Sequence, residues 1–180
     1  MQFIYEPIWF LLPAGFANMA PVFAAKVFPR WDFPVDARKT FRRIRIFGDH
    51  KTIRGLVAGV LLSAGVFLIQ KKAYLSINWI RTISAFDYGK MPVSFGALTG
   101  FGALFGDLIK SFFKRRVGID PGKSWFPFDQ IDWILGCLAA TSLAVRPSST
   151  LVFSSILMAL VLSLIVKWLG YLLRLEKNPI

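Results

Sequence analysis

Four aspartates and five basic residues lie between positions 107 and 132, inside a chain that is otherwise strongly apolar. If the residues after Asp107 are helical, then Asp107, Lys110 and Lys114 share one face, because positions three and four apart are neighbours on a helix. Asp129 and Asp132 are three apart and share a face in the same way. Carboxylates are ligands that Mg²⁺ takes, usually together with substrate phosphates. The spacing therefore favours a site for a divalent cation and phosphate groups.

The cost of placing these charges near a membrane supports the same interpretation. An ionised residue at the centre of a membrane helix costs about 2.5–3.5 kcal/mol to insert, and grouped carboxylates also repel one another. A divalent cation would offset both costs, and nearby basic residues would then meet phosphate: Lys114, Arg115, Arg116 and Lys123. The simpler alternative is that the basic run only marks the cytoplasmic end of a helix and that each aspartate is a solvated cap.

A second polar cluster, RRIRIFGDHKTIRG, occupies residues 42–55. Its glycines can present backbone N–H groups to phosphate, and the N-terminus of a helix that begins here would favour an anion. The G-x-x-x-x-G-K-[ST] spacing of a P-loop is absent. We expect His50, the only histidine, to make a polar contact rather than to bind metal. The cluster contains Asp49, His50, Lys51, Thr52 and Arg54, which together favour a site for a polyphosphate.

The elements that must position these residues are apolar helices. Of the 180 residues, 55% are hydrophobic, and five stretches carry no charge: 7–25, 55–70, 91–106, 133–145 and 147–166. Since a membrane-spanning helix needs about 20 apolar residues, we predict an all-α integral membrane protein with five transmembrane helices. It forms one domain over 1–180. The helices lie near 4–27, 53–71, 91–114, 129–146 and 149–173, and the loops that carry the site are 28–52 and 115–128.

Three of these stretches are short for a full membrane. Residues 133–145 separate Asp132 from Arg146. At about 1.5 Å per residue they extend only about 20 Å, against about 30 Å of hydrocarbon. Either the helix is sunk in a cavity or Asp132 lies below the membrane surface. The same argument puts Asp107 and Arg54 at the membrane edge.

The distribution of basic residues predicts the orientation. Nine of the 22 Lys and Arg residues lie in 26–54 and five in 110–123, against four in 71–90. By the positive-inside rule the first two segments and the C-terminus are cytoplasmic and the N-terminus is outside. The protein is thus expected in the cell membrane as a multi-pass protein, with its site facing the cytoplasm. The net charge of +12 belongs to this pattern, so nucleic acid is not an expected partner.

The glycine and cysteine residues exclude several other kinds of site. GFGALFG at 100–106 lacks the strand and βαβ unit of a dinucleotide-binding motif. Its glycines, with Gly55 and Gly59, are expected to let membrane helices approach closely. Glycine-rich faces would also suit a homodimer. Cys137 is the only cysteine, which excludes an internal disulfide and a cysteine-based metal cluster.

The stretch from Gly106 to Asp132 resembles the signature of CTP-dependent phosphatidate cytidylyltransferases. That signature has a Ser, two residues and Lys-Arg, then an Asp, a Pro-Gly turn, and two Asp residues three apart. Here these are Ser111, Lys114, Arg115, Asp120, Pro121, Gly122, Asp129 and Asp132. Bacterial and eukaryotic members are longer and have Pro-Gly-His-Gly-Gly, where this chain has PGKSW. The short chain, GDHKTIRG and LPAGFANMAPV near the start resemble the archaeal branch, the CDP-archaeol synthases.

The resemblance implies that CTP reacts with an isoprenoid ether lipid phosphate, 2,3-bis-O-geranylgeranylglycerol 1-phosphate. The products are the CDP-activated lipid and pyrophosphate. It implies Mg²⁺ as cofactor and membrane lipids as surroundings. The implied metal ligands are Asp107, Asp129 and Asp132, with Lys114 and Arg115 as further catalytic residues. Phosphate or nucleotide contacts are implied for Asp49, His50, Lys51, Thr52, Arg54, Ser111 and Lys123. Asn18, a polar residue in the first span, lines the lipid pocket or only bonds a neighbouring helix.

Three alternatives stay open at this level. The same reaction could act on diacyl phosphatidate, since apolar helix faces do not distinguish ether from ester chains. A small transporter or channel would also place acidic and basic residues in membrane helices, but nearer the middle of the membrane. A CDP-alcohol phosphotransferase would need a D-G-x-x-A-R motif, which the sequence lacks.

Overall fold

The computed structural model describes residues 2–120, 123 and 125–172, and the side chains of all of these except 2, 163 and 166–172. The described chain is mainly helical, which confirms the predicted helical class, whereas the five membrane crossings stay a prediction. The helices are α1 Gln2–Val27, α2 Ile53–Ser76, α3 Asn78–Thr82, α4 Ser94–Arg116, α5 Phe128–Ser142 and α6 Ser149–Leu172. The strands β1 Thr40–Phe41 and β2 Ile44–Arg45 form an antiparallel hairpin in the first long loop. The Pro121–Gly122 turn, residue 173 and the basic tail lie outside the described residues.

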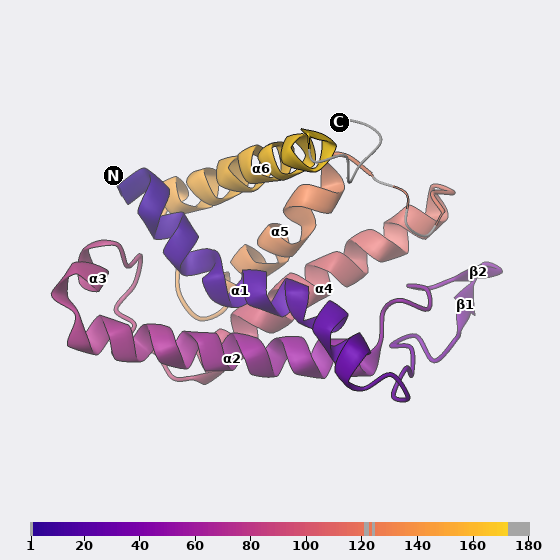
Figure 1. The fold of residues 1–180 in the computed structure, drawn as a ribbon, viewed down its shortest axis with the longest axis horizontal. Helices are drawn as coiled ribbons and strands as arrows, with labels where there is room; N and C mark the ends of the chain where they lie inside the picture. Colours follow the sequence, from indigo (N-terminus) through magenta and orange to yellow (C-terminus); the bar gives the residue numbers. More distant parts are fainter. Residues whose placement is uncertain (1, 121–122, 124, 173–180) are drawn as a thin grey trace.

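Five long helices run between two ends of the molecule (Figure 1). The β1–β2 hairpin, the last turn of α4 and the first turn of α5 lie at one end, at the right of the view. The N-terminus and α3 lie at the other end. The connection 28–52 and the described residues of the connection between α4 and α5 therefore lie on the same side, where the sequence places its two polar clusters.

Helices α4 and α5 pack against each other at glycines. A Cβ atom on Gly136 would lie 2.1 Å from the carbonyl oxygen of Gly102, and one on Gly106 would lie 2.2 Å from that of Asp132. Gly100 has the same role against α2, where its Cβ would lie 2.3 Å from Cβ of Ser63. The expectation that glycines permit close helix packing is confirmed. These glycine faces are occupied within the chain, and a homodimer through them stays a prediction.

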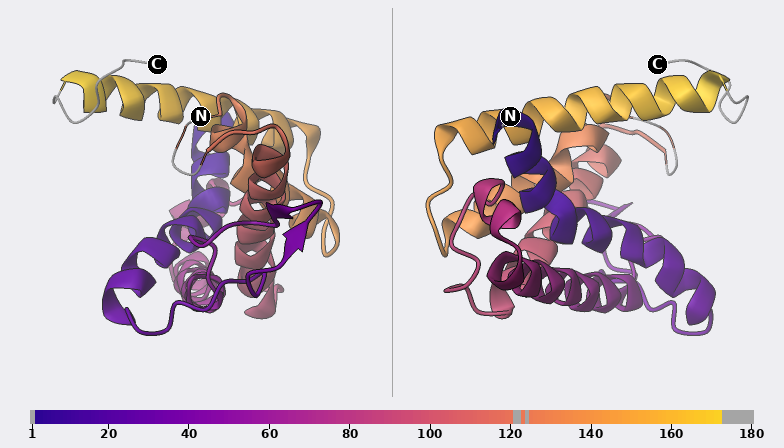
Figure 2. Two further views of the ribbon diagram at one scale, coloured as in Figure 1. Left: turned by 90° about the vertical axis from the view of Figure 1, so that its right-hand side faces the viewer. Right: turned by 60° about the vertical axis from the view of Figure 1, so that its left-hand side comes forward.

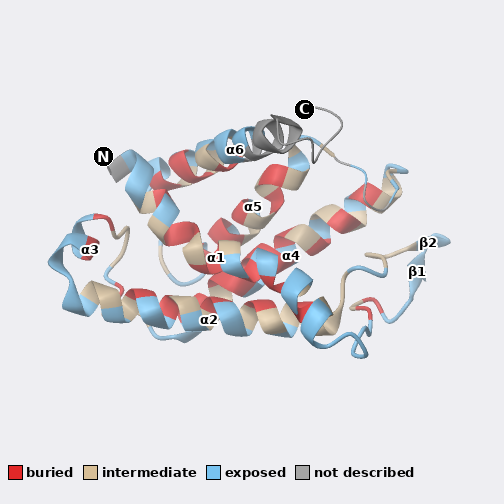
Figure 3. Cartoon of the chain, in the orientation of Figure 1, coloured by how far each residue is buried: buried red, intermediate tan, exposed pale blue. Residues whose placement is uncertain are grey.

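Large apolar side chains cover much of the outer surface. Leu61 and Ile69 of α2 are 67% and 68% exposed. Figure 3 shows the outward faces of α1, α2 and α6 largely exposed, whereas buried residues concentrate where α4 meets its neighbours. By length and composition, Phe3–Val27 and Ile53–Ser76 are long and apolar enough to cross a membrane, and Ser149–Leu162 is a shorter apolar segment.

Helix α6 packs along α1 and α5 rather than on α4 (Figure 2). The contact buries Leu151 together with Phe10 and Ile134 in one apolar cluster. Helix α5 has only 15 residues, which is about 22 Å at 1.5 Å per residue. It is thus shorter than the predicted helix near 129–146, and its N-terminal aspartates lie at the end of the bundle that carries the loops.

Candidate active site

A single ammonium group joins three carboxylates at the crossing of α4 and α5. Nζ of Lys110 lies 3.0 Å from Oδ1 of Asp107 and 2.9 Å from Oδ1 of Asp129. It lies 2.8 Å from Oδ2 of Asp132, as a charge contact without hydrogen-bond geometry. The side chain of Asp132 is only 6% exposed. The three aspartates predicted to act together are therefore brought together, and Lys110 lies between them.

Two more lysines flank this carboxylate cluster. Nζ of Lys114 lies 3.1 and 3.0 Å from the two carboxylate oxygens of Asp129. Lys51, which comes from the loop before α2, pairs with Asp107. Three lysines thus pair with three aspartates in a region that is largely closed to water, and this pairing offsets part of the cost of burying each charge.

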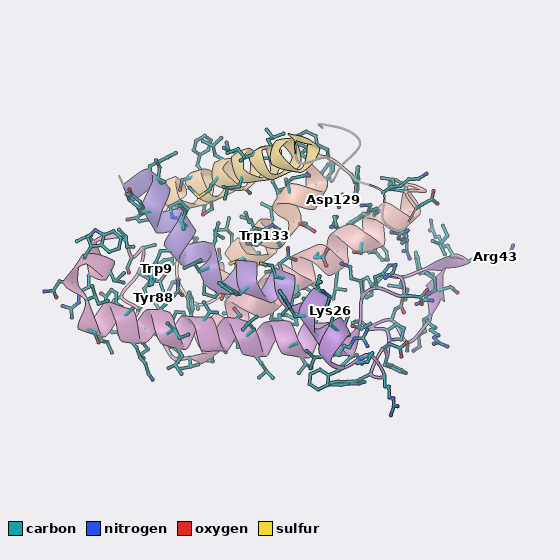
Figure 4. The ribbon with its side chains drawn as sticks, viewed as in Figure 1. Trp9, Lys26, Arg43, Tyr88, Asp129 and Trp133 are labelled. Carbon is teal, nitrogen blue, oxygen red and sulfur yellow. The ribbon has the colours of Figure 1, made fainter. Side chains whose placement is uncertain are left out.

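Helix geometry explains why these groups meet. Asp107, Lys110 and Lys114 are at positions i, i+3 and i+7 of α4 and so share a face. Gly106 allows the backbone of α4 to touch the carbonyl of Asp132 on α5. A larger residue at Gly106 would hold the two helices apart and separate the aspartate of α4 from those of α5. Figure 4 shows Asp129 at the start of α5, near the end of the bundle that carries the loops.

A polar pocket of about 400 Å³ opens beside the cluster. The loop before α2 and the last turns of α4 contribute its basic and small residues. They are Arg45, Phe47, Gly48, Asp49, His50, Lys51, Lys110, Ser111, Lys114 and Arg115. The pocket therefore joins six of the residues predicted in the loop and on α4 to the carboxylate cluster, and it also includes Arg45 and Lys110.

The loop that forms one wall of this pocket is organised around a buried carboxylate. Asp36 accepts hydrogen bonds from the backbone N–H groups of Arg38, Phe47 and Gly48 and from the guanidinium of Arg45. Burial opposes ionisation of Asp36, but these hydrogen bonds outweigh it and lower its pKa from 3.8 to about 2. Nothing in the spacing of the sequence indicated this role for Asp36.

Arg116 fastens the same loop to α4. Its guanidinium donates to the carbonyls of Arg45 and Ile46, each at 3.0 Å. It also lies 3.7 Å from the ring centroid of Phe112 and 5.5 Å from that of Phe41. Such stacking of a guanidinium on aromatic rings is favourable. Arg116, which the sequence suggested for phosphate, therefore holds the β1–β2 hairpin over the end of α4.

Two residues of the GDHKTIRG segment have contacts away from the cluster. Arg54 donates to the carbonyls of Phe28 and Pro29, at 2.7 and 3.0 Å. Thr52 is the N-cap of α2 and accepts from the N–H of Gly55. Both line a second polar cavity of about 330 Å³, which shares Asp49 and His50 with the first pocket. Thr52 also lines a small cavity of about 40 Å³ together with Lys51 and Asp107. In this arrangement Arg54 and Thr52 secure the loop and the helix start.

Lys123 and Asn18 also lie apart from the cluster. Nζ of Lys123 pairs with Oδ2 of Asp120 at 2.7 Å, and both side chains are largely exposed. Asn18 is exposed on α1. Among the described contacts, neither reaches Asp107, Asp129 or Asp132, so their predicted roles in phosphate and lipid binding stay predictions.

An apolar groove approaches the cluster from the other direction. It lies between α4 and α5, has a volume of about 710 Å³ and is lined along α4 from Leu98 to Phe113. On α5 its lining extends from Phe128 to Leu143, and it also includes Lys110 and Asp132. The cluster thus lies where a basic pocket and an apolar groove meet.

The donor set of the cluster is suited to a hard divalent cation. Three carboxylates from two helices converge on one position, and Mg²⁺ prefers oxygen ligands at about 2.0–2.1 Å. Within the described residues, no three acidic, histidine or cysteine side chains form a metal-binding group as they stand. In the described structure the Lys110 ammonium lies within 3.0 Å of an oxygen of each of the three carboxylates.

Comparison with known proteins gives the family of the chain. The family model of CarS-like CDP-archaeol synthases matches residues 1–179. The chain belongs to the CDP-archaeol synthase family. It is therefore a cytidylyltransferase of lipid biosynthesis, which removes the transporter alternative. The resemblance carried by the motifs around Asp107 and GDHKTIRG is thereby confirmed.

Individual members of the CDP-archaeol synthase family match over most of their length. The Pyrococcus furiosus CDP-archaeol synthase is 33% identical over 184 residues, which covers 99% of this chain and 99% of that protein. The Thermococcus onnurineus CDP-archaeol synthase is 35% identical, with 89% of this chain and 85% of that protein covered.

A solved structure of an intramembrane enzyme for archaeal membrane lipids biosynthesis also matches. It is 31% identical to this chain with a TM-score of 0.71, and the match covers 91% of this chain and 93% of that one. The agreement in fold, together with the apolar helices, identifies the chain as a membrane enzyme.

Proposed function

We propose that this protein transfers CMP from CTP to 2,3-bis-O-geranylgeranylglycerol 1-phosphate, with Mg²⁺ as cofactor. The observation that carries the proposal is the position of the carboxylate cluster, between a basic pocket suited to a nucleoside triphosphate and an apolar groove suited to isoprenoid chains. An enzyme that joins a polar and a lipid substrate needs both kinds of surface to meet at the reacting groups.

The reaction requires little acid–base help from the protein. A phosphate monoester carries about −1.5 to −2 charge at neutral pH and is already a nucleophile. One of its oxygens attacks the α-phosphorus of CTP, and the bond from that phosphorus to the bridging oxygen breaks. Pyrophosphate leaves with the electron pair. The protein must align the two phosphates and neutralise their charge.

The residues present fit these two tasks. Asp107, Asp129 and Asp132 would hold Mg²⁺, which when bound neutralises negative charge on the phosphates. Lys114 and Arg115 line the basic pocket and would bind the triphosphate. Their positive charge favours the leaving pyrophosphate and orients it away from the apolar groove.

The loop before α2 would close the nucleotide side of the site. Lys51 and His50 line the same pocket, together with Asp49 and with Ser111 of α4. A neutral polar contact from His50 suits the ribose or base, and Lys51 suits a phosphate. Arg54 and Thr52 are proposed to support bound nucleotide through the loop that they stabilise, and a direct phosphate contact by Lys123 stays a prediction.

We further propose the membrane arrangement that the basic loops predict. Helices α1, α2, α4, α5 and α6 cross the membrane as one domain, with the N-terminus outside and the loops 28–52 and 115–128 in the cytoplasm. The alternation of the loops between two ends of the bundle supports this topology. CTP then reaches the basic pocket from the cytoplasm, and the lipid reaches the groove from the membrane.

A transfer assay tests the proposed reaction. Purified protein is incubated in detergent with α-labelled CTP, Mg²⁺ and either the geranylgeranyl ether phosphate or a diacyl phosphatidate. We expect labelled CDP-lipid with the ether substrate and much less with the ester. Equal turnover of both lipids would contradict the assignment of the substrate, and equal turnover of ATP and CTP would contradict that of the nucleotide.

A further inference from the structure

We propose that Lys110 is an internal substitute for the metal ion: it holds the three carboxylates together before Mg²⁺ binds and leaves that position when Mg²⁺ arrives. This inference rests on the proposed metal site at Asp107, Asp129 and Asp132. It concerns a residue that the sequence motifs do not assign.

The geometry of the ammonium group is the first argument. Nζ of Lys110 is within 3.0 Å of an oxygen from each of the three aspartates. No other lysine in the described chain pairs with all three; Lys51 contacts Asp107 and Lys114 contacts Asp129. The Lys110 side chain is only 15% exposed. It therefore acts as the central cation of the cluster, not as a solvated surface lysine.

Size and charge are the second argument. Mg²⁺ draws its oxygen ligands to about 2.0–2.1 Å, whereas the carboxylates stand 2.8–3.0 Å from the ammonium. One position cannot hold both cations, since they repel each other and require different oxygen separations. Binding of the metal must therefore displace the Lys110 ammonium.

The displaced ammonium has a destination nearby. Lys110 lines the basic pocket beside Lys114 and Ser111, as well as the mouth of the apolar groove. A change of rotamer moves its charge from the carboxylates toward the pocket in which the triphosphate is proposed to lie. Metal binding thus exposes a further positive group on the phosphate side, so that metal and nucleotide assist each other. Lys110 is a positioning residue in the metal-free state.

Metal binding without nucleotide tests the exchange. Mn²⁺, detected by electron paramagnetic resonance, is titrated into wild-type protein and into Lys110→Met. Methionine keeps the unbranched apolar stem of lysine without the ammonium group, so it does not compete for the carboxylates. Removing a competing state strengthens apparent affinity, and we expect Mn²⁺ to bind at least about tenfold more tightly to the variant. Lys90→Met removes an exposed lysine that also pairs with an aspartate three residues away, and it should leave Mn²⁺ affinity unchanged.

The outcomes separate this inference from the proposed function. Equal or weaker Mn²⁺ binding by Lys110→Met than by wild type would overturn the exchange while leaving the metal site intact. Absence of Mn²⁺ binding in both proteins would overturn the metal site and the exchange together. A double variant that carries both Lys110→Met and Asp132→Asn should lose tight Mn²⁺ binding. That loss would show that the tighter binding by Lys110→Met arises at this cluster.

A second measurement uses the wild-type protein and so does not depend on how the variant folds. Acetylation of lysines by a water-soluble reagent is quantified by mass spectrometry, with Mg²⁺ or with EDTA and without nucleotide. We expect Lys110 to be protected in EDTA and to be modified several-fold faster in Mg²⁺, while Lys90 reacts equally in both. Unchanged or slower modification of Lys110 in Mg²⁺ would contradict its displacement.

Discussion

The candidate active site consists of a few charged side chains that neutralise one another. Asp107, Asp129 and Asp132 lie against Lys110, and Lys51 and Lys114 flank them. The i, i+3 spacing on α4 already indicated that Asp107 and Lys110 share a face. That Lys110 also reaches both aspartates of α5 follows only from the helix crossing.

Substitution of the aspartates tests their role. Asp107→Asn, Asp129→Asn and Asp132→Asn keep the size of the side chain but remove the charge that would hold Mg²⁺. We expect each to lower transfer by about a hundredfold or more, the range measured when one preorganised electrostatic group is lost. Initial rates at saturating CTP measure the effect.

Asp120→Asn is the matched control for these variants. Asp120 pairs only with Lys123 in the described structure, and both are exposed, where ion pairs are worth about 0–1 kcal/mol. Its activity should stay close to that of wild type. If Asp120→Asn were inactive while the other three variants kept their activity, the site would have to be built around the loop.

At the scale of elements, two devices position the site: the glycine contact between α4 and α5, and the folded loop between α1 and α2. The first was predicted in kind, because glycines in apolar helices permit close packing. The second was predicted only as a polar loop. Its β1–β2 hairpin and the Asp36 centre depend on contacts between residues that have no periodic relation.

Enlarging Gly106 tests the helix contact. Gly106→Ala places a methyl group against the carbonyl of Asp132 and forces α4 and α5 apart. We expect a loss of about 1–3 kcal/mol of stability, as for other overpacked sites, and a larger loss of activity than of stability. Gly65→Ala is the control, since a Cβ there meets no atom within 4 Å. Thermal unfolding and transfer activity are measured for both variants. Equal stability and activity of Gly106→Ala and Gly65→Ala would argue that the crossing of α4 and α5 does not position the site.

The lowered pKa of Asp36 predicts that the stability of the folded protein depends on pH. Because the pKa is lowered from 3.8 to about 2 in the folded protein, ionised Asp36 stabilises the fold fully above about pH 4. This contribution, about 2 kcal/mol, is lost as the pH falls toward 2. Unfolding measured from pH 6 to pH 2 should show the loss in wild type. In Asp36→Asn the loss of stability between pH 4 and pH 2 that Asp36 causes should be absent, and the stability at neutral pH should be lower than in wild type. A variant with the same acid dependence as wild type would exclude Asp36 as its source.

At the scale of the whole molecule, the bundle separates a polar end from an apolar body. The hairpin, the basic pocket and the carboxylate cluster lie at one end of the helices, and the exposed apolar faces of α1, α2 and α6 cover the remainder. Such a separation suits an enzyme that draws one substrate from water and one from the membrane.

Labelling from one side of the membrane tests the proposed orientation. Single cysteines are introduced as Phe41→Cys in the hairpin and Ser84→Cys in the segment after α3. The native Cys137 is buried and should not react. In right-side-out vesicles an impermeant reagent should label position 84 and leave position 41 unlabelled until the membrane is opened. Labelling of both positions from the same side would contradict the five-span arrangement.

The sequence by itself determined the helical class, the polar end and the three carboxylates, because these depend on apolar runs and on local spacing. It also carried the family, through motifs whose residues stand close together in the chain. The tertiary structure decided which charges pair. Lys110 became the centre of the cluster, and Arg116, Thr52 and Arg54 bind the loops and the start of α2, because the glycine crossing and the Asp36 loop set distances between residues far apart in sequence. Electrostatic interactions depend on those distances, and no one-dimensional spacing contains them.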